Sequence, residues 1–508
     1  MESSSNRTKP SGSGGNVPEK PSGDGGGGAP GSSSSASVSY SGATEIASDT
    51  TTSESYKSTT GGQNAVLVSG GTVNFLDVSV TKTGDESSEN SDFYGTNAAV
   101  LVYNGATLVM KSGSVETDAS HANAVFAYGD GKISLNGTKI VTSGNNSGGI
   151  MVTGGGSLTA ENVTVKTSGN SAAAIRSDRG GGTMKVTGGT YETSGTGSPA
   201  IYSTAKVTVT DATLSAMASE GVVIEGKNSV TLTGVKLVDT NNKLNGNSET
   251  YKNIFIYQSM SGDADEGVGS FTASSSEIVT NKGDTFFVTN TTAEITLSGN
   301  SITNNDKTGV LLRAQSGKWG TSGNNGGIVT MTWNGQQATG DIVLDEISTL
   351  NFVLAEGSYY KGALNSGNTA ENIECEVSAD SIIVLTGDSY VTSLANEDDS
   401  NTNIYANGYK LFVNGTEVAI NQSKNIPEMV VGTLTTETTE DVTATKTDAG
   451  VPGWVWWTIG GVILAIIVAV VAVLMMKNRK RKGNGPEMPP SIPSTPSTPV
   501  PPVVPPVQ

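Results

Sequence analysis

The feature that most constrains the fold is a repeat of about 24 residues that recurs through most of the chain. Each copy has two apolar residues two positions apart, a glycine or small polar residue, and a third apolar residue seven positions after the first. One copy cannot bury its own apolar side chains, so neighbouring copies must stack. Copies begin at Val73, Leu108, Ile133, Leu158, Met184, Val207, Val230, Phe271, Ile295 and Ile383.

A second apolar run precedes most copies, for example at residues 65–68, 99–102 and 149–152. With a third, weaker segment, each period can hold three short strands separated by Gly, Asn and Asp turns. Stacking at about 4.8 Å per turn would pair each strand with its equivalent in the next period, giving roughly a dozen turns and a rod on the order of 60 Å long. The pattern therefore predicts an all-β fold, a parallel β-helix with three strands per turn. The signatures of a leucine-rich repeat or a propeller are absent.

The composition agrees with short strands joined by many turns, because the chain has 65 glycines and only 6% aromatic residues. The net charge is −18, and the part before residue 477 is more acidic still, since a basic cluster follows it. Such an acidic surface repels nucleic acid, so we expect no nucleic-acid partner. The single cysteine, Cys375, allows no internal disulfide, and its alternation with charged neighbours predicts that it faces the core.

Residues 451–476 are predicted to form a transmembrane helix, because the stretch from Trp454 to Met476 is predominantly apolar and uncharged. Aromatic residues at its start suit the headgroup boundary, and the basic cluster at its end should stay in the cytoplasm. We therefore expect a single-pass protein of the cell membrane, in contact with lipid, with an extracellular N-terminal part and a cytoplasmic C-terminus. The predicted anchor residues are Trp454, Trp456, Trp457, Lys477, Arg479, Lys480, Arg481 and Lys482.

The remaining sequence divides by composition. Residues 1–39 are predicted to be a disordered Gly/Ser/Pro-rich arm, and residues 40–420 the β-helix ectodomain, with divergent C-terminal turns and a cap over 340–420. Residues 421–450 read as a Thr/Glu-rich stalk, and 477–508 as a basic, then proline-rich, cytoplasmic tail.

Two of these segments carry further expectations. The proline-rich tail could bind a cytoplasmic polyproline-binding partner, or serve as an unstructured spacer. The first 60 residues contain no apolar signal segment, so we expect a missing signal peptide, encoded upstream of the first residue.

Five side chains are candidates for a binding site. Arg176, Asp178, Arg179 and Arg313 follow apolar runs at the ends of predicted strands, and Trp319 lies on a Gly-rich loop where it could stack on a sugar ring. In the alternative interpretation the charges are solvated and discourage edge-to-edge aggregation. The tryptophan would then pack on the side of the solenoid.

No cofactor is expected, although Asp263, Asp265 and Glu266 form an acidic loop that could bind calcium through oxygen ligands. Its spacing matches no known calcium loop, and a solvated acidic loop is the alternative. The only histidine, His121, stands in a polar turn, so we expect it to be solvated. A metal site rich in histidine is thereby excluded.

Four segments resemble a known group, the pectate-lyase-like, right-handed β-helix surface proteins of bacteria and archaea that are often described as adhesin-like. They are Gly131-Lys-Ile-Ser-Leu-Asn-Gly137, Asn228-Ser-Val-Thr-Leu-Thr-Gly234, Leu385-Thr-Gly-Asp-Ser-Tyr-Val-Thr-Ser393 and Asn407-Gly-Tyr-Lys-Leu-Phe-Val-Asn-Gly415. The resemblance covers about residues 44–420. It implies a right-handed helix and a role at the cell envelope in adhesion or carbohydrate contact.

The favoured function is a non-enzymatic adhesin, or a scaffold that binds extracellular glycans or other cell surfaces through many weak contacts. The main alternative is a polysaccharide lyase or glycoside hydrolase, since pectinolytic relatives of this fold use clustered aspartates. No catalytic residue is assigned, because the acids on predicted strands are scattered: Asp211, Glu225, Asp341 and Asp345. A purely structural stalk is the third possibility.

Overall fold

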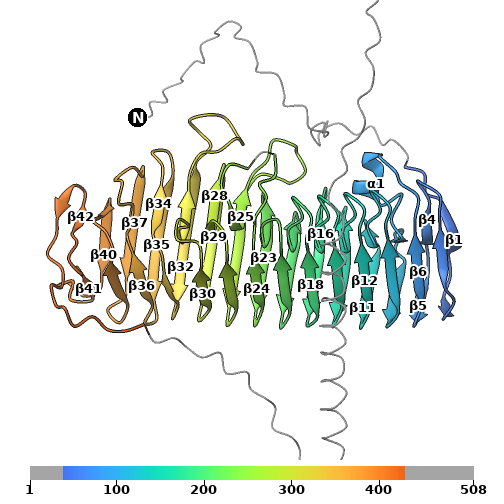
Figure 1. The fold of residues 1–508 in the computed structure, drawn as a ribbon, viewed down its shortest axis with the longest axis horizontal. Coiled ribbons are helices and arrows are strands. Elements are labelled where there is room, and N and C mark those ends of the chain that lie inside the picture. Colours follow the sequence, from blue (N-terminus) through green and yellow to red (C-terminus); the bar gives the residue numbers. More distant parts are fainter. Residues whose placement is uncertain (1–37, 247, 430–508) are drawn as a thin grey trace, which may run out of the picture. The chain divides into compact units, whose positions relative to one another are not determined.

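A computed structural model describes residues 38–246 and 248–429, which form a parallel β-helix (Figure 1). From residue 42 to residue 362, every third strand along the chain joins the same sheet, so each of these turns contributes one strand to each of three sheets, and later strands extend only two of the three. The predicted β-helix with three strands per turn is therefore confirmed. Two of the sheets have 14 strands, slightly more than the dozen turns expected.

Sheet A contains β1 (Gly42–Ile46), β4 (Asn64–Val68), β7 (Val100–Val102), β10 (Val125–Tyr128), β13 (Ile150–Thr153), β16 (Ile175–Ser177), β19 (Ile201–Ser203), β22 (Val222–Glu225), β25 (Lys252–Tyr257), β28 (Asp284–Thr289), β31 (Leu312–Ala314) and β34 (Ile342–Leu344). Sheet B contains β2 (Thr50–Thr52), β5 (Thr72–Leu76), β8 (Thr107–Lys111), β11 (Lys132–Asn136), β14 (Gly156–Glu161), β17 (Gly182–Thr187), β20 (Lys206–Thr210), β23 (Ser229–Thr233), β26 (Val268–Ser274), β29 (Thr291–Ser298), β32 (Gly327–Asn334), β35 (Thr349–Ala355), β37 (Asn372–Val377) and β40 (Ser393–Asn396). Sheet C contains β3 (Tyr56–Ser58), β6 (Ser79–Lys82), β9 (Ser114–Thr117), β12 (Lys139–Thr142), β15 (Thr164–Thr167), β18 (Thr190–Thr193), β21 (Thr213–Ala216), β24 (Lys236–Asp239), β27 (Glu277–Thr280), β30 (Ser301–Asn304), β33 (Gln337–Thr339), β36 (Tyr359–Gly362), β38 (Ile382–Leu385) and β41 (Ile404–Tyr405).

The core lies inside the coil and consists of apolar side chains stacked from turn to turn. The repeat residues Leu108 and Met110 of β8 pair in register with Ile133 and Leu135 of β11, and all four are buried. Because the side chains of a strand alternate between its two faces, residues two apart both point inward. The two apolar residues at the start of each repeat are therefore the ones that sheet B points into the core.

Threonine side chains close the corner after sheet C. The hydroxyls of Thr142, Thr167 and Thr193 donate to carbonyl oxygens five residues ahead in the chain, at 2.6, 2.5 and 2.5 Å. The three threonines are in register on successive strands, and each is buried. These bonds satisfy carbonyl groups that would otherwise be buried without a partner.

The last turns have a different core, in which aromatic rings replace stacked aliphatic side chains. Trp333, Phe352 and Tyr360 meet edge to face, with ring centroids 5.2 to 5.9 Å apart. Cys375 is buried beside them on β37, as its alternation with charged neighbours predicts. A small sheet of β39 (Ser389–Val391), β42 (Leu411–Val413) and β43 (Thr416–Glu417) lies at this end, and its last two strands are antiparallel.

One short helix, α1 (Glu89–Tyr94), interrupts the early turns and was not expected from the sequence. Ser88 caps its first turn, and Gly95 ends it in the left-handed conformation. No helix within residues 38–429 is long and apolar enough to cross a membrane. The predicted helix 451–476, the predicted arm up to residue 37, the predicted stalk from residue 430 on and the predicted cytoplasmic tail lie outside the described residues.

Candidate functional site

The outer face of sheet A is unusually apolar. One register position, which we call the outer column, carries a large side chain on eleven successive strands. Its members are Leu67, Leu101, Phe126, Met151, Arg176, Tyr202, Val223, Phe255, Phe287, Arg313 and Val343. Solvent-facing strand positions are usually polar, so a column of this kind indicates a face that other groups cover or bind.

Two apolar clusters form along the outer column. The first gathers Leu101, Phe126 and Met151 beneath helix α1 and the ring of Tyr40. The second gathers Val223, Phe255, Tyr257 and Phe287, with Tyr202 and Trp319 packed against it. Arg176 lies between the two clusters.

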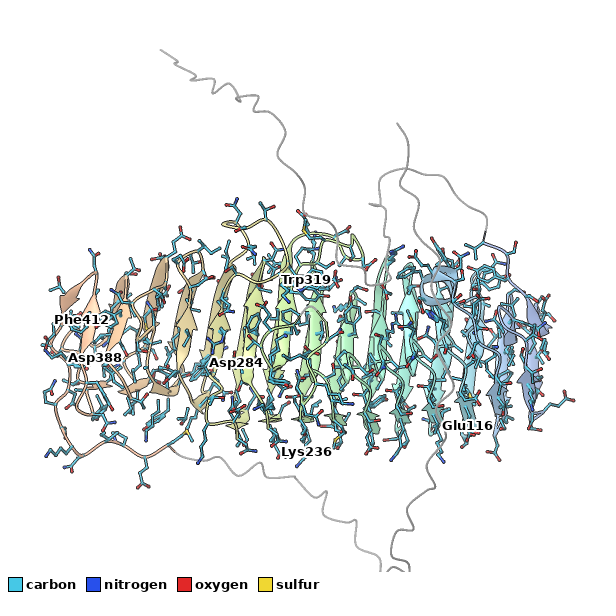
Figure 2. The ribbon with its side chains drawn as sticks, turned by 45° about the horizontal axis from the view of Figure 1, so that its top comes forward. Glu116, Lys236, Asp284, Trp319, Asp388 and Phe412 are labelled. Carbon is cyan, nitrogen blue, oxygen red and sulfur yellow. The ribbon has the colours of Figure 1, made fainter. Side chains whose placement is uncertain are left out.

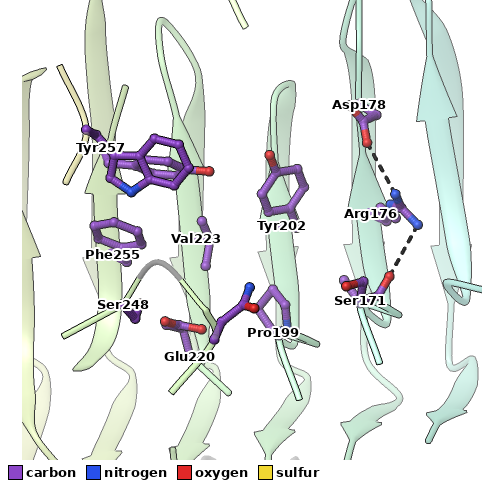
Figure 3. Close-up of a pocket in the computed structure, with 14 residues that line it drawn as sticks. Ser171, Arg176, Asp178, Pro199, Tyr202, Glu220, Val223, Ser248, Phe255 and Tyr257 are labelled. Atoms are coloured by element: carbon purple, nitrogen blue, oxygen red, sulfur yellow. Dashed lines mark hydrogen bonds and ion pairs between the residues drawn. The ribbon is translucent and has the colours of Figure 1, made fainter. Parts of the chain in front are cut away.

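A cavity of about 280 Å³ opens at this point, and we call it the aromatic pocket (Figure 3). Its floor comes from four successive strands of sheet A, β16, β19, β22 and β25, with the segments just before them. Asn245 and Ser248 of one loop and Trp319 of another form its walls. Figure 2 places Trp319 among loops at the upper edge of the view and Lys236 at the opposite edge.

Three aromatic rings define one end of the pocket. Phe255 and Tyr257 stack with centroids 4.4 Å apart and planes inclined by 12°. The Trp319 ring lies 5.4 Å from Tyr257. Trp319 is half-buried against Tyr257, in agreement with the alternative in which it packs on the side of the solenoid.

A buried ion pair defines the other end. Arg176 Nη2 lies 3.3 Å from Asp178 Oδ2, and the two side chains are only 12% and 7% exposed. Arg176 also donates to the carbonyl oxygens of Asn146 and Ser171 at 3.2 and 3.4 Å. Burial raises the pKa of Asp178 to about 7, and the charge of Arg176 opposes part of this rise. The alternative of solvated charges therefore does not describe this pair.

Behind the pocket lies a buried carboxylate, Glu225. Tyr257 Oη donates to Glu225 Oε2 at 2.8 Å, and the hydroxyls of Tyr202 and Ser259 also donate to this carboxylate. Burial first, and then the charge of Glu225, hold the pKa of Tyr202 and of Tyr257 well above the usual tyrosine range. Within residues 38–246 and 248–429, all hydrogen-bond donors to the carboxylate of Glu225 are hydroxyl groups.

A second carboxylate, Glu220, lines the pocket directly. Its Oε1 lies 3.4 Å from Lys252 Nζ, and both side chains are almost fully buried. Lys252 Nζ also lies 4.4 Å from the centre of the Phe255 ring. Burial lowers the pKa of Lys252, although the charge of Glu220 acts in the opposite direction.

Arg179 lies at a second, more polar cavity of about 660 Å³. Its Nε is 2.6 Å from Asp263 Oδ1, and its guanidinium lies 3.6 Å from the centre of the Phe93 ring of α1. Asp265 also lines this cavity, whereas Glu266 does not. Among the residues that the structure describes, no group of three or more His, Cys, Asp or Glu side chains is placed to hold a metal ion. Asp263 is therefore engaged by an arginine, and the proposed calcium ligands do not converge.

Arg313 lines neither of these two cavities. Its guanidinium binds Asp284, with Nε–Oδ2 and Nη2–Oδ1 distances of 2.6 and 3.4 Å. The three arginine candidates therefore do not share one groove. The structure brings Arg176, Asp178 and Trp319 to one pocket, Arg179 to its neighbour, and Arg313 to a separate ion pair.

One sequence-based expectation about a titratable residue was wrong. The four strand acids expected to be scattered, Asp211, Glu225, Asp341 and Asp345, line neither cavity, but Asp178 and Glu220, which were not among them, line the same pocket, and Glu225 lies behind it. His121 was expected to be solvated, but its Nδ1 lies 2.8 Å from Asp92 Oδ2 of α1.

Other site residues were not identified from the sequence. Tyr202 and Tyr257 gave no signal beyond their strand positions, and Glu220 gave none in the segment before β22. Comparison with protein-family models, with curated proteins and with solved structures finds no match to this chain.

Proposed function

We propose that this chain is a membrane-anchored cell-surface protein whose right-handed β-helix binds carbohydrate in the aromatic pocket, as an adhesin or binding scaffold without catalysis. The observation that supports this proposal is the pairing of aromatic rings at one end of the pocket with buried charged groups at the other.

The pocket suits a sugar for chemical reasons. A pyranose ring has an apolar face of C–H groups and a rim of hydroxyls, so it needs an apolar wall and a few fixed polar partners. Trp319 and Tyr257 supply the wall, and Arg176, Asp178 and Glu220 supply charged donors and acceptors. A volume of about 280 Å³ is near the lower limit for ligand sites, so the pocket would hold one or two rings of a longer chain.

The rest of the proposal comes from the sequence. The apolar segment 451–476 would anchor the protein, and the acidic solenoid before it would project from the cell. Many copies on one surface would turn weak binding to single sugars into firm adhesion. The proline-rich tail would remain available to a cytoplasmic partner.

A second candidate is a glycoside hydrolase or polysaccharide lyase acting on the same ligand. It is favoured by Asp178 and Glu220, two carboxyl groups on one pocket, and by the raised pKa of Asp178 at about 7, which suits a general acid. Turnover of a bound glycan would favour this candidate over the adhesin.

The test is a glycan array probed with the full-length protein, followed by analysis of each bound glycan for cleavage. We expect binding without products, and at least tenfold weaker binding for Trp319→Ala. The control is Tyr409→Ala, which removes an aromatic ring that is 41% exposed and lies outside the pocket. No binding to any glycan, or equal losses in both variants, would contradict the proposal.

A further inference from the structure

We infer that the aromatic pocket selects a ligand carrying a positively charged amine, such as a glycan with free glucosamine units. This inference rests on the proposed function and specifies its ligand. It depends on the charges around the pocket and on how the tyrosine rings are polarised.

Above the pKa of Asp178, which is about 7, the charges around the pocket are not balanced. Three carboxylates lie on or directly behind its walls, Asp178, Glu220 and Glu225, against two cations, Arg176 and Lys252. Asp178 is paired with Arg176, and Glu220 with Lys252. The carboxylate of Glu225 has only hydroxyl donors, so its negative charge is the one that no protein cation neutralises within the described residues.

That charge acts on the aromatic wall of the pocket. Tyr202 and Tyr257 donate hydrogen bonds from their hydroxyl groups to the Glu225 carboxylate, which shifts electron density from each oxygen into its ring. An electron-rich ring attracts a cation above its face more strongly. The Tyr257 ring also contacts Trp319, whose indole is the best cation–π partner among the aromatic side chains.

Lys252 Nζ lies 4.4 Å from the centre of the Phe255 ring, but no protein cation within the described residues lies over the rings of Tyr257 or Trp319. Arg176 is held at the opposite end by Asp178 and by two backbone carbonyls. Lys252 points at Glu220 and the loop residues Ser248 and Thr250. A ligand ammonium above Tyr257 and Trp319 would therefore meet aromatic faces backed by an unpaired carboxylate.

The occupant is an ammonium rather than a metal ion because aromatic faces, not converging oxygen ligands, form this end of the site. The energy of such a contact is about 0.5–2 kcal/mol, which corresponds to roughly two- to thirtyfold in affinity. Acetylation of the amine removes its charge, so the free and acetylated forms of one sugar make a matched pair of ligands.

The experiment measures binding to the full-length protein by calorimetry with four probes: tetramethylammonium, and oligomers of glucosamine, N-acetylglucosamine and glucose. We expect the glucosamine oligomer to bind about tenfold more tightly than the other two sugars, and tetramethylammonium to compete with it. Trp319→Ala should abolish this preference, because it removes the indole that forms the aromatic wall beside Tyr257. Glu225→Gln should reduce it severalfold, and Tyr202→Phe gives a second, milder test if Glu225→Gln does not fold. The control Glu192→Gln removes an exposed carboxylate paired with Lys166 and should change nothing.

The outcomes separate the two proposals. Equal binding of all three sugars would overturn the amine inference and leave carbohydrate binding intact. Binding of tetramethylammonium without any sugar would support the amine site and overturn the proposed function. Failure of all four probes would overturn both.

Discussion

Arg176 on β16 lies in register with Tyr202 on β19, at the point where the outer column passes from one covered apolar cluster to the other. Helix α1 covers the column before this point, and the loop bearing Trp319 packs on it afterwards. The turns that carry Arg176 and Tyr202 have short connections, so nothing in the same turns shields them. The pocket is therefore a gap between insertions rather than a separate structural element.

Removing Arg313 should destabilise the protein more than removing Asp284, although both changes break the same ion pair. Asp284 is 2% exposed, whereas Arg313 is 22% exposed and can reach water. Arg313→Ala therefore leaves a buried carboxylate without its ion-pair partner and should lower the free energy of unfolding by about 3 kcal/mol, against about 1 kcal/mol for Asp284→Ala. Urea unfolding followed by circular dichroism measures both. Equal losses, or a double variant less stable than Arg313→Ala alone, would contradict this account.

Asp239 should make stability fall as pH rises. It is buried on the inner side of β24, and burial raises its pKa to about 9 from about 4 in the unfolded chain. Between these values the folded state holds a proton that the unfolded state has lost, so stability decreases by up to about 1.4 kcal/mol per pH unit. Asp239→Asn should have little effect at pH 4 and raise the melting temperature increasingly from pH 6 to 9. The exposed control Asp211→Asn should show no such trend.

Much of the solenoid could be predicted because each strand is specified by the spacing of apolar residues within one repeat. The spacing of Leu108, Met110 and Val115 recurs in the next turn. It recurs because each strand must point its apolar side chains into the core in register with the strand before it. Cys375 was placed in the core by the same alternation. Helix α1 has six residues and no apolar periodicity, so the sequence pattern could not predict it.

The site was less predictable because it depends on distances between turns. Arg176 and Asp178 stood out as charges after an apolar run, but their burial depends on the loops that cover sheet A. Glu225 looked like one acid among many, since its hydroxyl partners Tyr202 and Tyr257 lie 23 and 32 residues away. Only the lengths of the intervening loops decide that these residues meet, and repeat spacing does not encode them.

The aromatic core near the C-terminal end should be sensitive to Trp333. Its side chain is fully buried and contacts Phe352 and Tyr360 edge to face. Trp333→Ala should cost about 3–5 kcal/mol because it leaves a large cavity. Stability in a solenoid is approximately a sum over neighbouring turns, so the loss should be local. Hydrogen exchange should quicken over β32, β35 and β37 while β8 and β11 keep their protection, and uniform loss of protection would contradict this expectation.

Cys375 should report opening of the same region. Its thiol is buried between Phe352 and Leu394 on neighbouring strands, and burial raises its pKa to about 12. Because the thiolate is the reactive form, a thiol reagent should label the native protein at pH 8 at least a hundredfold more slowly than the urea-unfolded chain. Trp333→Ala should speed native labelling, whereas a change in a distant turn, such as Phe126→Ala, should not.

Acidification should weaken binding of a permanent cation in the aromatic pocket. The pKa of Asp178, raised by burial to about 7, means that its carboxylate gains a proton as pH falls through neutrality. The charged groups that act on it are Arg176, which favours ionisation, and Asp263 and Glu225, which oppose it. Protonation leaves Arg176 without its partner and makes the pocket more positive. His121, whose pKa is raised by its hydrogen bond to Asp92, also gains positive charge near Arg176 as pH falls.

Tetramethylammonium keeps its charge at every pH, so its dissociation constant should rise severalfold from pH 8 to pH 5.5. Asp178→Asn should bind weakly throughout and flatten this profile, whereas His121→Gln should keep most of it. An unchanged profile in Asp178→Asn would assign the titration to another group.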